Sequence, residues 1–246
     1  MRTVGKGRQR DMENTKAFNI AIDGPAGAGK STIARLTAQK LGFVYVDTGA
    51  MYRAIALYML RNEIPVTDKE KVETAVKEVS ITIRYEEGSQ RVLLNGEDVS
   101  GLIRTEAVGN AASLVSAVPA VREHLLKLQR ELASSTNVIM DGRDIGTCIL
   151  PNADVKIFLS ASPAVRAKRR YKELTEKGET CSLEKIEQDI IKRDEQDANR
   201  PIAPLKAAED AVLIDSSDMS IEEVMNAIFA EVGKKGFHLP EGVLGK

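Results

Sequence analysis

The feature that most constrains the fold is the stretch from residue 22 to residue 42, IDGPAGAGKSTIARLTAQKLG, in which a glycine-rich loop separates two different patterns. Before the loop, residues 18–22 read FNIAI, a mostly apolar run that is typical of a strand. After the loop, apolar residues recur with the spacing of an amphipathic helix. A buried strand, a glycine loop and a helix in succession predict an α/β unit.

The loop itself has the composition of a phosphate-binding site. It matches the pattern GxxxxGK[ST] over Gly24, Pro25, Ala26, Gly27, Ala28, Gly29, Lys30 and Ser31. Glycines let backbone N–H groups curl around phosphates, the lysine ammonium reaches the β- and γ-oxygens, and the hydroxyl group ligates Mg²⁺. Because a strand precedes the loop and a helix follows it, we interpret it as a nucleoside triphosphate site and not as a simple turn. Neither NKxD nor TKxD occurs, which argues against a guanine switch.

Short apolar runs alternate with helical patterns along the chain. Five runs predict strands, at residues 18–22, 43–46, 138–140, 155–159 and 212–214. Seven amphipathic stretches predict helices, at residues 30–41, 50–62, 69–78, 119–134, 163–177, 183–198 and 220–232. Strands of that length between helices predict a parallel five-stranded sheet covered by helices.

Three local patterns add detail to this α/β fold. Residues 79–99 alternate apolar and polar residues around a Glu-Gly pair and an Asn-Gly pair, which predicts a small antiparallel meander inserted beside the parallel sheet. Residues 198–210 carry two prolines after a charged helix, which fits a loop at the carboxyl edge of the sheet. Ser220 with Glu223 three residues later is a capping-box signature at the start of the last helix.

Composition excludes several classes of protein. The 246 residues carry 35 basic and 36 acidic side chains, so no overall positive field favours nucleic acid. No apolar run reaches the length of a membrane span, and the basic residues 1–16 lack the apolar core of a secretory signal. Two cysteines without a CxxC pattern, Cys148 and Cys181, are expected to be small packed residues in a reducing cytoplasm.

Two strand ends carry candidates for a second site. Asp47, Thr48 and Gly49 follow the second predicted strand, and Arg53 lies one turn into the next helix, where its guanidinium group suits a phosphate. A plain turn and helix cap explains Asp47 to Gly49 equally well. Residues 138–147, VIMDGRDIGT, end the third predicted strand with three charged side chains that are costly to bury without partners.

Each of those three side chains suits a different part of a nucleotide or its metal ion. Asp141 resembles a Walker-B aspartate that holds the Mg²⁺ hydration shell. Arg143 suits a phosphate, and the Asp144 carboxylate suits an exocyclic amino group such as that of cytosine. Downstream, two charged groups recur at helical spacing: Arg166, Arg169 and Arg170, then Arg193, Asp197 and Arg200. Spacing alone favours solvated helix faces for both groups.

Six strings in this order and spacing resemble bacterial cytidylate kinases: GPAGAGKST, DTGAMYRA, NGEDVSGLIRTEAVGNAAS, DGRDIGT, VKIFL and IKRDEQDANRPIAPL. The resemblance covers about residues 18–232. It implies a P-loop kinase with a core, an acceptor-binding insert and a mobile lid, which transfers the γ-phosphoryl group of ATP to CMP or dCMP with Mg²⁺. It also implies a cytoplasmic monomer with no nucleic-acid or membrane partner. Some relatives carry serine in place of Thr48 and glycine in place of Ser31.

The resemblance assigns expected roles to individual residues. The ATP cradle would comprise Gly24, Pro25, Ala26, Gly27, Ala28, Gly29, Lys30, Ser31 and Thr32, with Ser31 and water-bridged Asp141 for the metal. Arg53, Arg143 and Arg200 would hold the acceptor phosphate. Ser113, Arg122 and Asp144 would read the cytosine near Thr48, and Arg193 and Asp197 would contact the pentose. Lys30, Arg166, Arg170, Arg193 and Arg200 would act on the transferring phosphoryl group.

These inferences predict a leader at residues 1–16, a kinase domain at residues 17–233 and a tail at residues 234–246. Within the domain, the insert is expected at about residues 64–117 and the lid at about residues 163–203. Two alternatives stay open: a P-loop module that binds nucleotide and signals to a partner, and a kinase for UMP, AMP or a small alcohol. The Asp144 carboxylate favours cytosine over uracil, because it would repel the uracil O4.

Overall fold

The computed structural model describes residues 16–243, and its centre is a sheet of five parallel strands. The order across the sheet is β2 (Val44–Asp47), β6 (Val138–Gly142), β1 (Asn19–Asp23), β7 (Val155–Ser160) and β8 (Val212–Asp215). The predicted fold class is confirmed, and every strand end lies within two residues of its prediction. The predicted leader falls outside the described residues, except for Lys16.

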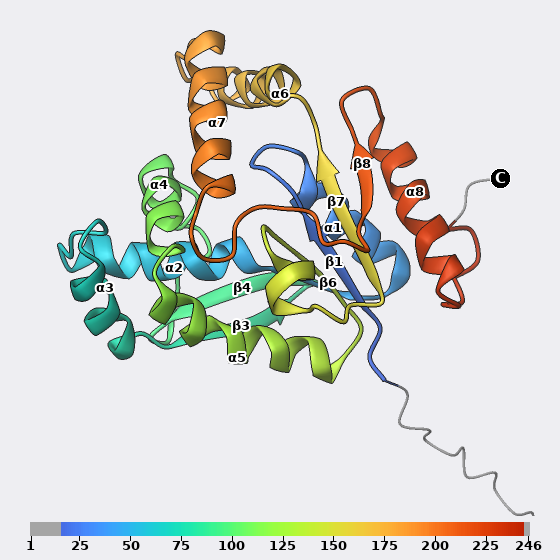
Figure 1. The fold of residues 1–246 in the computed structure, drawn as a ribbon, viewed down its shortest axis with the longest axis horizontal. Helices are drawn as coiled ribbons and strands as arrows, with labels where there is room; N and C mark the ends of the chain where they lie inside the picture. Colours follow the sequence, from blue (N-terminus) through green and yellow to red (C-terminus); the bar gives the residue numbers. More distant parts are fainter. Residues whose placement is uncertain (1–15, 244–246) are drawn as a thin grey trace, which may run out of the picture.

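Helices cover both faces of this sheet (Figure 1). One face carries α1 (Lys30–Leu41) and α8 (Ile221–Lys234), and the other carries α2 (Thr48–Arg61) and α5 (Pro119–Ser135). Alternate residues of β1 serve the two cores: Ile20 and Ile22 pack with α1 and α8, whereas Ala21 packs with α2 and α5. Burial on both faces explains why the central strands appear in the sequence as largely apolar runs.

The insert beside the parallel sheet is the predicted antiparallel meander. It comprises α3 (Lys69–Ala75), a 3₁₀ turn (Val76–Glu78), and strands β3 (Ile81–Glu86), β4 (Ser89–Leu94) and β5 (Glu97–Asp98). The Asn95-Gly96 turn joins β4 to β5 with φ values of 49° and 88°, a conformation that asparagine and glycine tolerate best. In Figure 1 the insert lies across the sheet from α8.

Two elements were absent from the sequence prediction. The helix α4 (Glu106–Val115) begins after Thr105, whose hydroxyl accepts a hydrogen bond from the N–H of Val108. A glycine and an asparagine in its middle weaken its helical pattern, and packing against α2 compensates for them. Residues Ile145–Ile149 form a single wide π-helical turn directly after the charged end of β6. Such turns have no distinctive sequence pattern.

The predicted lid segment contains two helices, α6 (Pro163–Glu176) and α7 (Leu183–Ala198), which pack against each other. Figure 1 shows both standing beyond the sheet edge that carries the glycine loop. The capping box at the start of α8 is confirmed, because the Ser220 and Glu223 side chains each accept a hydrogen bond from the other residue's backbone N–H. Among the described residues, we find no helix with the length and hydropathy of a membrane span.

Candidate active site

The glycine loop joins β1 to α1 and leaves the beginning of that helix open. Gly24, at φ 147°, lies so close to β7 that an added Cβ would come within 1.9 Å of the carbonyl oxygen of Leu159. Gly29 precedes α1 at φ 87°, and no side chain caps the helix there. The N–H groups of the first turn and the positive end of the helix dipole are therefore available to an anion.

Lys30 is the first residue of α1 and lies folded back over the loop. Its Nζ donates a hydrogen bond to the carbonyl oxygen of Pro25 at 2.7 Å, and the side chain is buried. Burial, followed by the positive charge of Arg143, lowers the pKa of the ammonium group to about 7, although Asp141 and Asp23 act in the opposite direction. A polyanion placed beside it would favour the charged form.

The two predicted metal residues meet at the end of β6. The Ser31 hydroxyl donates to Oδ2 of Asp141 at 2.8 Å, and the Tyr45 hydroxyl donates to Oδ1 at 3.1 Å. Burial, followed by the negative charge of Asp47, raises the pKa of Asp141 to about 6. Serine and aspartate oxygens are hard ligands of the kind that Mg²⁺ takes, alongside water and phosphate oxygens.

Two side chains at the end of β2 make hydrogen bonds: one caps helix α2, and the other joins the start of α2 to β6. The Asp47 carboxylate accepts a hydrogen bond from the N–H of Ala50 at 2.9 Å, so the cap interpretation of this stretch is confirmed. The Thr48 hydroxyl donates to the carbonyl oxygen of Asp141 at 2.7 Å. An added Cβ at Gly142 would come within 2.8 Å of that hydroxyl, so the glycine allows the two strand ends to approach.

Buried guanidinium groups lie where β6, α4 and α7 meet. Nε of Arg143 donates to Asp197 at 2.9 Å, and Nη1 of Arg200 donates to the Ser116 hydroxyl at 3.2 Å. Nε and Nη2 of Arg200 and Nε of Arg193 are buried with no hydrogen-bond partner in the described part of the chain. Unpaired buried cationic donors are costly, so an anion that accepts from them would be strongly favoured. The solvated-face interpretation is therefore wrong for Asp197 and Arg200, which are both buried.

A second ion pair lies beside this cluster. Arg122 of α5 donates to the Asp144 carboxylate and, at 3.4 Å, to the carbonyl oxygen of Ser116. Its guanidinium carbon lies 5.7 Å from the centre of the Tyr52 ring. Burial raises the pKa of Asp144 and outweighs the lowering effect of Arg122. Ser113, on the last turn of α4, is half-buried, and its carbonyl oxygen accepts from the Ser116 hydroxyl.

Arg53 reaches from α2 toward the same region. Its Nη1 donates to the carbonyl oxygen of Ile103 at 3.2 Å, and a Cβ at Gly109 would come within 2.9 Å of that nitrogen. Burial, followed by the positive charge of Arg193, lowers the pKa of Arg53 to about 10. Burial and the charge of Arg143 likewise lower the pKa of Arg193. These arginines therefore repel one another in the absence of a bound anion.

The three arginines of α6 have different partners. Arg166 is buried, and it donates to the carbonyl oxygen of Ala26 in the glycine loop at 3.0 Å and to the Asp194 carboxylate of α7. Arg169 donates to the carbonyl oxygen of Ser216 at 2.7 Å. Arg170 is partly exposed and pairs with Glu173 of its own helix. The solvated-face interpretation is thus wrong for Arg166 and fits Arg170.

Several residues around the site were missing from the sequence-based prediction. They are Asp23, Tyr45, Gln90, Arg104 and Ser116. The Gln90 side chain exchanges two hydrogen bonds with the backbone of Asp47, and Arg104 pairs with the Asp47 carboxylate at 2.7 Å. These contacts attach the insert to the core. Only Asp23 could have been noticed from the sequence, as a charged residue ending an apolar strand.

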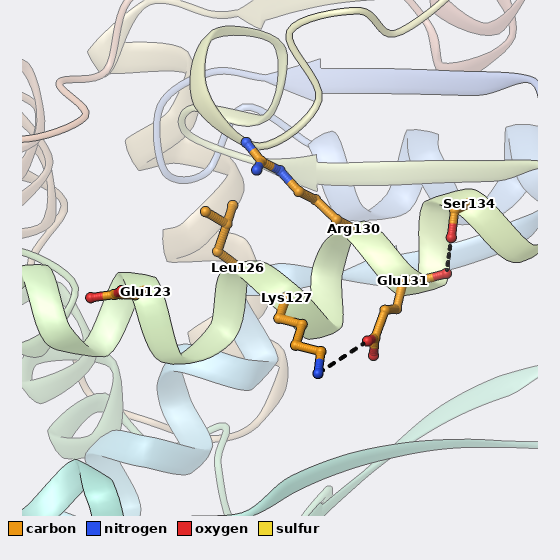
Figure 2. Close-up of a pocket in the computed structure, with 6 residues that line it drawn as sticks. All are labelled: Glu123, Leu126, Lys127, Arg130, Glu131 and Ser134. Atoms are coloured by element: carbon orange, nitrogen blue, oxygen red, sulfur yellow. Dashed lines mark hydrogen bonds and ion pairs between the residues drawn. The ribbon is translucent and has the colours of Figure 1, made fainter.

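Two surface cavities lie near these elements. One, of about 330 Å³, opens between the first turn of α1 and the insert, with Ser31, Tyr45 and Arg104 in its lining. The other, of about 510 Å³, runs along α5 and is lined by Glu123, Leu126, Lys127, Arg130, Glu131 and Ser134 (Figure 2). None of the predicted site residues lines the cavity along α5. We therefore do not assign this cavity to the site, although it has the larger volume of the two.

The cysteines were expected to be packed residues with free thiols. Both thiols are free. Cys148 is exposed, so packing is the wrong expectation for it. The residue lies on the outer side of the π-helical turn, where its neighbour Ile149 takes the buried position.

The parallel sheet and the open glycine loop between β1 and α1 define a P-loop protein, with a cationic cluster beside the loop. The chain belongs to the cytidylate kinase family, because the family model described as Cytidylate kinase matches residues 20–234. A cytidylate kinase of Caldicellulosiruptor bescii is 51% identical over 213 residues, which cover 87% of this chain and 94% of that protein. One of Carboxydothermus hydrogenoformans is 48% identical over 218 residues, covering 89% and 98%.

Among solved structures, a shikimate kinase from Bacteroides thetaiotaomicron matches with a TM-score of 0.44 and 16% identity, covering 88% of this chain and 98% of that one. No assignment rests on that weak likeness.

Proposed function

We propose that the chain is a nucleoside monophosphate kinase that transfers the γ-phosphoryl group of ATP to CMP or dCMP, giving CDP or dCDP and ADP. As a member of the cytidylate kinase family it is a phosphotransferase, with ATP as the donor. The observation that carries the acceptor assignment is the pairing of two chemistries at one sheet edge. The Asp144 carboxylate suits an exocyclic amino group, and the unpartnered nitrogens of Arg200 suit a phosphate.

The acceptor would be held by residues from α2, α4, α5, the end of β6, α7 and the loop after α7. We assign its α-phosphate to Arg53, Arg143 and Arg200, its base to Ser113, Arg122 and Asp144 with Thr48 alongside, and its pentose to Arg193 and Asp197. The buried unpaired guanidinium nitrogens support the phosphate assignment. The chain of contacts from Asp144 through Arg122 and Ser116 to Arg200 supports one continuous pocket for base and phosphate.

The donor would lie on the glycine loop. Backbone N–H groups of residues 24–32 would surround its phosphates, and Lys30 would leave Pro25 to reach the β- and γ-oxygens. Ser31 and Asp141 fit a magnesium ion, because their oxygens lie 2.8 Å apart beside the open start of α1. When bound, Mg²⁺ would supply charge neutralisation on the β- and γ-phosphates.

Transfer would need no nucleophilic side chain, because an acceptor phosphate oxygen already carries negative charge and attacks the γ-phosphorus in line. Catalysis then depends on positioning and charge neutralisation. We assign that neutralisation to Lys30, Arg166, Arg170, Arg193 and Arg200, for which an arginine-finger contribution of about 10³ to 10⁵ in rate is the known scale. Closure of α6 and α7 over both nucleotides would exclude water and limit ATP hydrolysis.

We also propose a compartment, a class of partner and an oligomeric state for the chain. The free thiols of Cys148 and Cys181 support a reducing compartment such as the cytoplasm. A balanced overall charge supports small-molecule partners over nucleic acid. We propose that the chain acts as a monomer.

A coupled ADP-release assay with ATP and Mg²⁺ tests this function, with CMP, dCMP, UMP and AMP as acceptors and a reaction without acceptor as the blank. Release with CMP and dCMP alone is the expected result. Equal release with UMP would favour another acceptor, and release without acceptor would favour an ATPase or a nucleotide switch.

Lys30→Ala should abolish transfer without unfolding the protein, because Lys30 is assigned to the transferring phosphoryl group. Lys40→Ala, at the exposed far end of the same helix, serves as the control. A folded Lys30→Ala variant with a near-normal rate would contradict the assignment.

A further inference from the structure

The π-helical turn at Ile145–Ile149 begins in an unusual way. The first N–H groups of a helical turn have no partner within the turn, and a side chain at the N-cap position normally accepts from them. Asp144 occupies that position, and aspartate is among the best capping residues. Its side chain nevertheless makes no capping hydrogen bond and pairs with Arg122 instead.

Asp23 supplies the missing cap from a different strand. Its Oδ1 accepts a hydrogen bond from the N–H of Ile145 and its Oδ2 accepts one from the N–H of Gly146, both at 2.7 Å. Asp23 is the last residue of β1, immediately before the glycine loop, and its side chain is buried. Gly146 leaves room for this approach, since an added Cβ would lie 3.2 Å from the Lys156 side chain and 3.4 Å from Asp23 Oδ2.

We propose that Asp23 is a positioning residue for acceptor selection: it caps the 145–149 turn in place of Asp144, and so leaves the Asp144 carboxylate free to face the acceptor base. The inference rests on the proposed function, in which Asp144 reads cytosine. Without the cap, two buried N–H groups would lack acceptors directly beside the Asp144 carboxylate. That carboxylate would then turn back to accept from the N–H of Gly146, the second residue of the turn, which is the ordinary behaviour of an N-cap aspartate.

A merely structural role for Asp23 predicts a different result. If Asp23 only fastened β1 to the turn, its loss would lower the stability of the protein and slow both CMP and UMP phosphorylation in proportion. If it holds Asp144 in place, its loss would change the ratio between the two acceptors. The ratio of kcat/KM for CMP to that for UMP therefore separates the two roles.

The test compares the wild type with Asp23→Asn, which keeps the shape but offers one acceptor oxygen in place of two. Asp154→Asn is the matched control, because Asp154 Oδ2 accepts from the N–H of Asn19 at 2.8 Å at the far end of the same strand. In Asp23→Asn we expect the CMP-to-UMP ratio to fall at least about tenfold, the scale of one lost hydrogen bond to a charged group. The loss should lie mainly in KM for CMP, and Asp154→Asn should keep the wild-type ratio.

Four outcomes decide the inference. A folded Asp23→Asn variant with an unchanged ratio would overturn it, even if both rates fall. A wild type that does not phosphorylate CMP would instead overturn the proposed function, so the two failures are distinguishable. If Asp23→Asn does not fold, amide hydrogen exchange in the wild type decides. Slow exchange at Ile145 and Gly146 would support the hydrogen bonds on which the inference depends, and exchange as fast as in exposed loops would overturn the inference.

Discussion

Arg122→Met isolates the buried ion pair between α5 and the charged end of β6. The side chains of Arg122 and Asp144 are 12% and 4% exposed. Methionine keeps most of the aliphatic length and removes the charge, so the Asp144 carboxylate stays buried without this partner. Breaking a buried pair from one side costs about 3 to 5 kcal/mol. At about 2 to 4 °C per kcal/mol for a chain of this size, the thermal midpoint should fall by roughly 6 to 20 °C.

The loss should depend on pH in a definite direction. Burial already raises the pKa of Asp144 above its ordinary value, and removal of Arg122 raises it further. A carboxyl group with a higher pKa in the folded state binds more protons when folded. The free energy of unfolding therefore falls as the pH rises from the unfolded pKa to the folded pKa. Because that range extends upward in the variant, its deficit should be larger at pH 8 than at pH 5.

Urea unfolding of the wild type and the variant at both pH values measures this effect. Lys127→Met on the same helix is the control, because Lys127 and Glu131 are 85% and 60% exposed and lie 3.8 Å apart. An exposed pair of this kind contributes less than about 1 kcal/mol. Equal losses in the two variants, or a deficit in Arg122→Met that does not grow with pH, would refute the reasoning.

Three further predictions concern separate parts of the chain. Gly24→Ala should cost at least about 2 kcal/mol in unfolding free energy, because the new Cβ meets the Leu159 carbonyl oxygen and the positive φ is strained; thermal unfolding measures it. Asp141→Asn should raise the half-saturating Mg²⁺ concentration about 10- to 100-fold, in activity and in calorimetric ATP binding alike, and overlapping Mg²⁺ titrations would contradict the metal assignment. Ser220→Ala should remove about 1 kcal/mol of stability through the cap it shares with Glu223 and leave the rate unchanged, as urea unfolding and ADP release would report.

Local patterns in the sequence were sufficient for the core of the fold. Strands buried on both faces are largely apolar, so residues 138–140, and residues 155–159 in spite of Lys156, could be predicted as strands without tertiary information. The helix α4 depends on its neighbours instead. Gly109 weakens its helical pattern, yet the same glycine lets the Arg53 guanidinium lie against the helix. A feature that exists for the sake of a partner 56 residues earlier has no local signature.

The same distinction applies to the site. Asp141, Arg143 and Asp144 were predictable as candidates because charged residues at the end of a buried strand need partners, and parallel strands end at one edge. Their roles remain predictions. These contacts were not predictable, since Asp23 accepts from N–H groups 122 and 123 residues away, and Gln90 of the insert accepts from the Asp47 N–H of the core, 43 residues earlier. Helical spacing also led to the wrong prediction of a solvated face for Asp197. Spacing indicates which residues share a helix face, but it does not indicate what packs against that face.

The arrangement of the arginines suggests why both nucleotides would be needed for closure. Burial, followed by the like charge of Arg143 at the end of β6, lowers the pKa of Arg193 on α7, while Asp197 of the same helix pairs with Arg143 at 2.9 Å. An acceptor phosphate would remove the repulsion between the two arginines and strengthen the attachment of α7 to the core that the Arg143–Asp197 pair already provides. Because α6 packs on α7, and Arg166 of α6 already contacts both Asp194 of α7 and the glycine loop, the same effect would press α6 onto the donor phosphates. One phosphate would thus set the geometry in which the other reacts.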